Sequence, residues 1–241
     1  MPELPAPLPP HERTVGQVVA ESIRFYGGHF WAALPLGIPL ALADQASVNQ
    51  HIAAQAFVFW AATPLFVAAY LWAIRLVLDG KTTRTAVIVA TLVWLPFPAL
   101  RAIFLNLPGI AWLAFIGLAV PAAAVEHLGF RDALVRGRKL GTADYVHALG
   151  SLATLVIVVG LSSFTLSSLL HSQGSSGQRV ALFLSDVVLS PLLFLGSALL
   201  YVDQAARVGS SGQPRRSRRD ADLHPSVDSE PAGRPDPQVE P

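Results

Sequence analysis

Long apolar segments separated by short polar ones are the feature that most constrains the fold of this chain. The segment 145–170 contains no Asp, Glu, Lys or Arg, and it exceeds the roughly 20 residues that a helix needs to cross about 30 Å of hydrocarbon. Charged residues make up only 14% of the 241 residues, against about 25% in soluble domains. Lipid offers no partners to polar groups, so a spanning segment must satisfy its own backbone. We therefore predict an all-α polytopic membrane protein.

Six segments have the apolar character of transmembrane helices, and we predict that each crosses the bilayer. They are 30–48, 52–78, 85–105, 110–125, 145–170 and 180–201. Proline lacks a backbone N–H and breaks or kinks a helix. We expect such kinks at Pro35, Pro39, Pro64, Pro96 and Pro191.

Two further segments predict amphipathic helices that lie on the membrane surface. The first begins at Thr14, which forms a capping-box pattern with Gln17. The second lies between residues 126 and 144, where one side carries Phe130, Ala133, Leu134, Gly137 and Leu140. Its other side carries the basic residues Arg131, Arg136, Arg138 and Lys139. This basic face could contact anionic lipid head groups.

The distribution of Lys and Arg predicts the orientation, because cytoplasmic loops are enriched in these residues. With six crossings and a cytoplasmic N-terminus, only Arg101 and Arg179 lie toward the outside. The pattern predicts a multi-pass protein of a bacterial inner (cell) membrane with both termini in the cytoplasm. Residues 1–13 are predicted to be a disordered lead, 14–207 a helical transmembrane domain, and 208–241 a disordered cytoplasmic tail.

Two stretches of the chain resemble each other. Thr63-Pro64-Leu65 matches Ser190-Pro191-Leu192, and a similar match leads from each predicted surface helix into the next span. Internal repeats in membrane proteins often frame a central site. Chance similarity among apolar helices explains the matches equally well, so both interpretations stay open.

Short motifs carry a resemblance to a known bacterial group. Glu126 and Gly129 follow the fourth predicted span, and Tyr201, Asp203 and Arg207 close the sixth. With this order of elements, the chain resembles bacterial multi-pass membrane proteins related to the membrane domain of glycerophosphoryl diester phosphodiesterases. The resemblance implies a helical membrane domain. No polar segment of this chain is long enough for the catalytic domain of those enzymes, so phosphodiesterase activity is not expected.

Ionisable residues inside predicted spans are candidate functional residues, because a charge there costs about 2.5 to 3.5 kcal/mol on insertion scales. Arg101 and Asp186 stand at similar depths from the same end of their spans, and we predict that they pair. A structural ion pair or snorkelling side chains is one interpretation, and a substrate or proton site is another. Asp203 and Arg207, four residues apart, suit a local ion pair on one helix.

Other polar residues indicate structure rather than chemistry. Several gather toward the predicted outer face, namely Asp44, His51, Gln55, Asn106 and His171. Their spacing matches no metal site, and no cofactor is indicated. The serines and threonines of 145–170 favour close helix packing.

No catalytic or nucleotide-binding motif is present in the sequence, so we do not expect an enzyme. The net charge of +1 gives no indication of nucleic-acid binding. Our first hypothesis is a non-catalytic membrane scaffold or accessory protein whose partners are the lipid bilayer and an unidentified protein. The alternative is a small transporter or channel, in which kinked helices line a polar cavity. A lipid-modifying enzyme is a weaker third option.

Overall fold

The computed structural model describes residues 9–101, 107–169 and 174–211, and all regular secondary structure in these ranges is helical. The first part of the chain forms η1 (Pro10–Glu12), α1 (Val15–Gly28), α2 (Phe30–Ala33), η2 (Leu34–Gly37), α3 (Ile38–Ser47), α4 (Ile52–Ala61) and α5 (Thr63–Leu78). The middle part forms α6 (Arg84–Trp94), α7 (Phe97–Arg101), α8 (Leu107–Ile116) and α9 (Ala119–Val125). The last part forms α10 (Phe130–Ala143), α11 (Tyr145–Leu169), α12 (Gly174–Leu189) and α13 (Pro191–Ser211).

Three to four helices are long and apolar enough to cross a membrane. Three are Leu107–Val125, Tyr145–Leu166 and Gly177–Gly209. A fourth is the pair α4 and α5, if these two helices, bent by 51° relative to each other, count as one span. The predicted first span is divided into α2, η2 and α3, and the predicted third span holds a shorter apolar helix, Arg84–Leu100. All six predicted segments thus contain helix, but prolines shorten two of them below the length of a straight span.

Helical structure continues a few residues beyond the predicted bounds 14–207. Residues 10–12 form η1, which packs on α13, and α13 continues to Ser211. Arg207 Nη2 donates a hydrogen bond to the main-chain oxygen of Arg13, at 2.7 Å. Residues 1–8 and 212–241 lie outside the described part.

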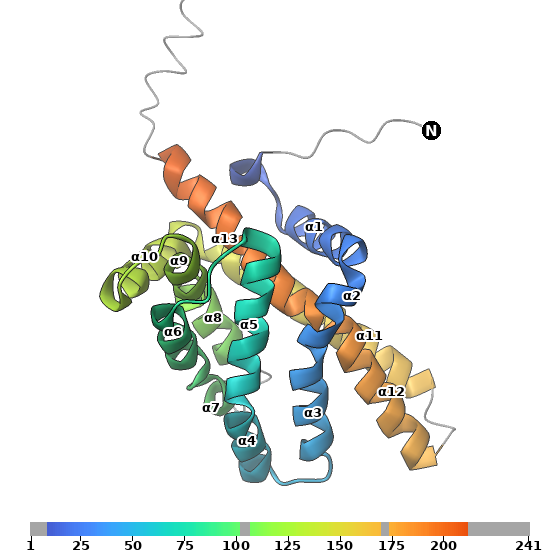
Figure 1. Cartoon of the computed structure of the whole chain (residues 1–241). Coiled ribbons are helices and arrows are strands. Elements are labelled where there is room, and N and C mark those ends of the chain that lie inside the picture. The colour runs from blue at the N-terminus through green and yellow to red at the C-terminus, as the bar shows by residue number, and fades with distance from the viewer. Residues whose placement is uncertain (1–8, 102–106, 170–173, 212–241) are drawn as a thin grey trace, which may run out of the picture.

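Helix α13 runs through the molecule and packs against α1, α5 and α11 (Figure 1). The helices η1, α1 and α10 and the C-terminal end of α13 lie at one end of the bundle, which we call the terminal end. The connection between α3 and α4 lies at the opposite end, which we call the distal end. The core between them centres on stacked aromatic rings, with Phe66 5.4 Å from Trp94 and 6.5 Å from Phe194 between centroids.

The two similar motifs occupy equivalent positions at helix breaks. Pro64 stands in the first turn of α5, and Pro191 begins α13. At the first break, Thr63 Oγ1 donates to the carbonyl of Phe59, four residues earlier, at 3.4 Å. At the second, Ser190 Oγ donates to the carbonyl of Asp186 at 2.6 Å. The sequence similarity therefore corresponds to the same local structure, whether or not the chain arose by duplication.

Aromatic side chains satisfy main-chain carbonyls near these breaks. Tyr26 Oη donates to Val188 O at 2.7 Å beside the break at Pro191, and Trp112 Nε1 donates to Val93 O at 2.9 Å beside the break at Pro96. Trp72 Nε1 likewise donates to Ala32 O, at 3.1 Å, just before η2. A carbonyl without a partner is costly in an apolar interior. These three carbonyls near the kinks therefore have side-chain donors within the protein.

Both predicted surface helices pack tightly against the protein. The capping box of α1 is confirmed, with Gln17 Oε1 2.8 Å from the Thr14 N–H, and α1 packs on α11 and α13. On α10, Gly137 and Gly141 face α9 and α8 so closely that an added Cβ would come within 2.4 Å of Ala119 or 2.3 Å of the Phe115 carbonyl. Phe130, placed with these glycines on the apolar side of α10, is 41% exposed.

Candidate functional site

A cavity of about 360 Å³ lies between α3, α7, α8, α11 and α12, reaching Leu193 of α13. Most of its wall is apolar, but Asp44, Gln45, Ser163 and Asp186 also line it. The polar and acidic residues come from α3, α11 and α12. The cavity thus combines apolar walls with two carboxylates, a combination suited to an amphiphile.

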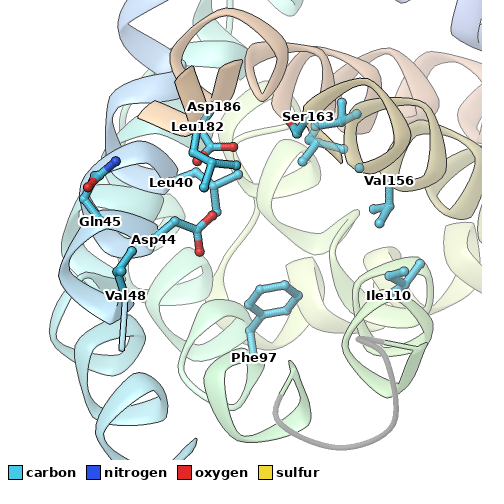
Figure 2. A pocket seen from close by; sticks show the side chains of 13 residues that line it. Leu40, Asp44, Gln45, Val48, Phe97, Ile110, Val156, Ser163, Leu182 and Asp186 are labelled. Carbon is cyan, nitrogen blue, oxygen red and sulfur yellow. The ribbon is translucent and has the colours of Figure 1, made fainter. Parts of the chain in front are cut away.

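The two carboxylates stand on the same side of the cavity (Figure 2). Asp44 comes from α3 and Asp186 from α12, while Phe97 and Ile110 form the opposite wall. Asp186 is 7% exposed and Asp44 is half-buried. Buried carboxylates are costly unless compensated, and they concentrate at functional positions in membrane proteins.

Hydrogen bonds between helices fix this side of the cavity. Gln45 Nε2 donates to the carbonyl of Arg179 at 2.6 Å, which joins α3 to α12. Ser185 Oγ donates to Ser163 Oγ at 2.7 Å, which joins α12 to α11. Ser163 thus has a packing role, as predicted for the serines of this segment, and also lines the cavity.

A smaller apolar chamber of about 90 Å³ adjoins the cavity. The two spaces share the lining residues Leu40, Phe97, Ile110, Val156 and Leu193. The chamber is also lined by Phe66, Trp94 and Phe194 of the aromatic core. Trp94 Nε1 is buried and has no hydrogen-bond partner among the described residues. The apolar volume thus extends from the carboxylates into the core.

The structure places one member of the predicted intramembrane pair at this cavity. Asp186 lines it, on the last full turn of α12 before the break. Arg101 ends α7, the helix that contributes Phe97, but the position of its side chain lies outside the described part of the structure. The pairing of Arg101 with Asp186 stays a prediction.

A second polar cluster lies at the terminal end and contains motif residues of the predicted resemblance. Tyr201 Oη donates to Glu126 Oε1 at 2.7 Å. Arg136 Nε donates to both oxygens of the same carboxylate, at 2.9 and 3.1 Å. Gly129 is the N-cap residue that precedes α10. Arg136 therefore belongs to an internal ion pair, whereas Arg131, Arg138 and Lys139 remain exposed as predicted.

The same cluster continues through Asp203, which is 1% exposed. Its Oδ2 lies 2.9 Å from His147 Nε2 and 3.6 Å from Arg207 Nη2, which confirms the predicted ion pair within α13. Arg207 Nη1 also donates to Asp144 Oδ2, at 2.9 Å. These contacts join α11, α13 and Asp144, the residue between α10 and α11, so we interpret the cluster as a structural clamp.

Sequence reasoning did not identify His147 or Asp144 as partners, because their pairing depends on α11 and α13 packing side by side. It placed Asp44 toward the outer face but did not predict that Asp44, on α3, lines a cavity. The signal in the sequence that could have identified Asp44 was its carboxylate within an apolar segment. His51 and Gln55 are at the start of α4, away from the cavity lining, while Asn106 and His171 lie outside the described residues. Within the described ranges, no three His, Asp or Glu side chains form a group that could hold a metal ion.

Comparisons of the chain with protein-family models, curated proteins and solved structures give no match. The resemblance to the membrane domain of glycerophosphoryl diester phosphodiesterases therefore stays an expectation.

Proposed function

We propose that this chain is a small membrane carrier that binds an amphiphile with a cationic head in the cavity beside Asp44 and Asp186. The observation that carries the proposal is the cavity of about 360 Å³, in which two carboxylates stand at one side and apolar walls lead into a second chamber. An ammonium group would pair with the carboxylates, and an apolar tail would occupy the remaining volume.

The charge balance supports a cationic head. Asp44 and Asp186 contribute two negative charges to the cavity lining. An anionic head would add charge of the same sign at low dielectric, which is unfavourable.

In this proposal the chain crosses a bacterial inner membrane six times, with both termini in the cytoplasm. The Lys and Arg distribution supports this orientation, and η1 and the end of α13 lie at the same end of the bundle (Figure 1). The cavity is then nearer the outer face. No catalytic role is proposed.

Ligand binding tests the proposal directly. The full chain in phosphatidylcholine nanodiscs is titrated with monodansylcadaverine, whose dansyl group is apolar and whose free amine is cationic. We expect saturable fluorescence enhancement that octylamine displaces and octanoate does not. Asp44→Asn and Asp186→Asn should each weaken binding about tenfold, corresponding to about 1.4 kcal/mol for a lost charged partner.

A pair of variants on α11 controls for the location of binding. Gly160 lines the cavity, and an added Cβ there would meet no atom within 4 Å, so Gly160→Phe should fill the cavity and abolish binding. Its neighbour Leu161 is 61% exposed and does not line the cavity, so Leu161→Phe should bind normally. Equal binding by both variants, or no saturable binding by the wild type, would overturn the proposal.

A scaffold or accessory protein is the second candidate, because Tyr26, Trp72 and Trp112 hold the helix breaks with hydrogen bonds. A carrier must change conformation during its cycle, whereas such bonds favour one conformation. Proteoliposomes loaded with octylamine distinguish the two: a carrier releases the amine faster than protein-free vesicles, and a scaffold does not.

A further inference from the structure

A second apolar groove lies on the other side of the bundle, between α6, α8 and α10. It has a volume of about 450 Å³. It is lined by Leu92, Val93, Leu95, Pro96, Trp112, Ile116 and Leu134. Trp112 is fixed there by its hydrogen bond to the Val93 carbonyl. The groove is therefore a formed feature of the fold, separate from the cavity of the proposed function.

Two arginines flank the groove on α10. Arg131 precedes Leu134 by three residues and Arg138 follows it by four, so both are neighbours of Leu134 on the helix surface, where the basic side of α10 borders its apolar side. Both are exposed, and neither makes an ion pair with the described residues. Arg136, by contrast, is held by Glu126. The rim of the groove thus has two available positive charges.

The side of α10 that carries Leu134 is packed against the protein. Gly137 and Gly141 approach α9 and α8 so closely that helix α10 has no room to rotate. Leu134 lines the groove, and the helix spacing places the two exposed arginines next to it. A basic rim above an apolar groove matches a molecule with a negative head and an acyl chain.

We infer that the groove between α6, α8 and α10 is a binding site for one anionic phospholipid, whose phosphate contacts Arg131 and Arg138 and whose acyl chain lies along Leu92, Trp112 and Leu134. Charge complementarity selects the anionic head, and the groove adds a requirement for a tail. The inference is independent of the amphiphile cavity, because the two sites share no lining residue.

The same helix provides a matched control. Lys139 follows Leu134 by five residues, which places it about 140° around the helix from Leu134. It is exposed like the two arginines. Replacing it removes a positive charge from α10 without removing a contact to the groove. General electrostatic attraction to anionic lipid should depend on all three residues, whereas the proposed site should not depend on Lys139.

Native mass spectrometry of the full chain in a mild non-ionic detergent tests the inference. The probes are phosphatidylglycerol and phosphatidylcholine with identical acyl chains, and glycerol 1-phosphate as the head group alone. We expect one tightly bound phosphatidylglycerol that exceeds phosphatidylcholine in affinity. Each lost arginine should weaken binding about fivefold, from about 1 kcal/mol per charge, so the double variant Arg131→Gln/Arg138→Gln should lose at least tenfold.

The control variant Lys139→Gln should change the affinity less than twofold, and glycerol 1-phosphate should not compete. Equal affinity for the two lipids, equal loss in Lys139→Gln, or full competition by the head group would each overturn the inference. If the double variant does not fold, Arg131→Lys/Arg138→Lys and the comparison of the two lipids on the wild type decide the question. If the wild type binds the two lipids with equal affinity, that result alone rejects the inference.

Discussion

At the residue scale, polar side chains of this protein act mainly on the backbone or on one another. Tyr26 donates to a carbonyl beside the break at Pro191, and Asp203 connects His147 and Arg207. An apolar surrounding makes each unsatisfied group expensive. The carboxylates of Asp44 and Asp186 also line an open volume, which is why we place the ligand there.

Tyr26→Phe should lower the free energy of unfolding by about 1 to 3 kcal/mol, because the Val188 carbonyl would lose its donor in a partly buried position. Thermal denaturation of the purified protein in detergent measures the loss. Tyr145→Phe is the control, since the Tyr145 hydroxyl makes a longer bond of 3.4 Å to the Ala111 carbonyl. A Tyr26→Phe variant as stable as Tyr145→Phe would contradict this role of Tyr26.

At the scale of elements, proline and glycine determine the arrangement of the helices. Prolines divide the apolar segments into short helices, and polar or aromatic side chains then satisfy the carbonyls near each break. Glycines act between elements: Gly137 and Gly141, four residues apart, allow α10 to approach α8 and α9 closely. Helix α10 is thus amphipathic in sequence because one side packs on protein and the other faces outward.

Gly137→Ala should destabilise the protein by about 1 to 3 kcal/mol, because the new Cβ would overlap the backbone of Ala119 in α9. Gly27→Ala on α1 should instead stabilise the protein. A Cβ at Gly27 meets no atom within 4 Å, and alanine is favoured over glycine inside a helix by about 0.5 to 1 kcal/mol. Both are measured by thermal denaturation, and equal effects would show that α10 does not pack closely.

At the scale of the whole molecule, apolar residues cover the outside of the bundle as well as its interior. Ile157, Leu161 and Phe164 of α11 are each more than half exposed, which suits a surface that faces lipid. The basic residues of α10 and the two described ends of the chain share the terminal end (Figure 1). This distribution agrees with the orientation proposed from the Lys and Arg pattern.

Cysteine labelling tests the orientation, and the sequence contains no cysteine that would interfere. Single cysteines replace Gln50, between α3 and α4, and Thr82, between α5 and α6, both of which are exposed. In spheroplasts of a bacterial host, a membrane-impermeant maleimide should label Gln50→Cys. Thr82→Cys should react only after the membrane is opened. Labelling of both from outside would contradict six crossings with cytoplasmic termini.

The sequence by itself determined the helical class and the positions of the apolar segments, because these depend on composition and local periodicity. It also determined the capping box at Thr14 and the ion pair between Asp203 and Arg207, whose members are neighbours on one helix. Only the tertiary structure decided that Asp44 and Asp186 line one cavity, that His147 contacts Asp203, and that α10 packs on protein. Those relations join residues that are far apart in the chain. Contacts between helices set the packing angles that bring these residues together, and no local sequence pattern encodes such contacts.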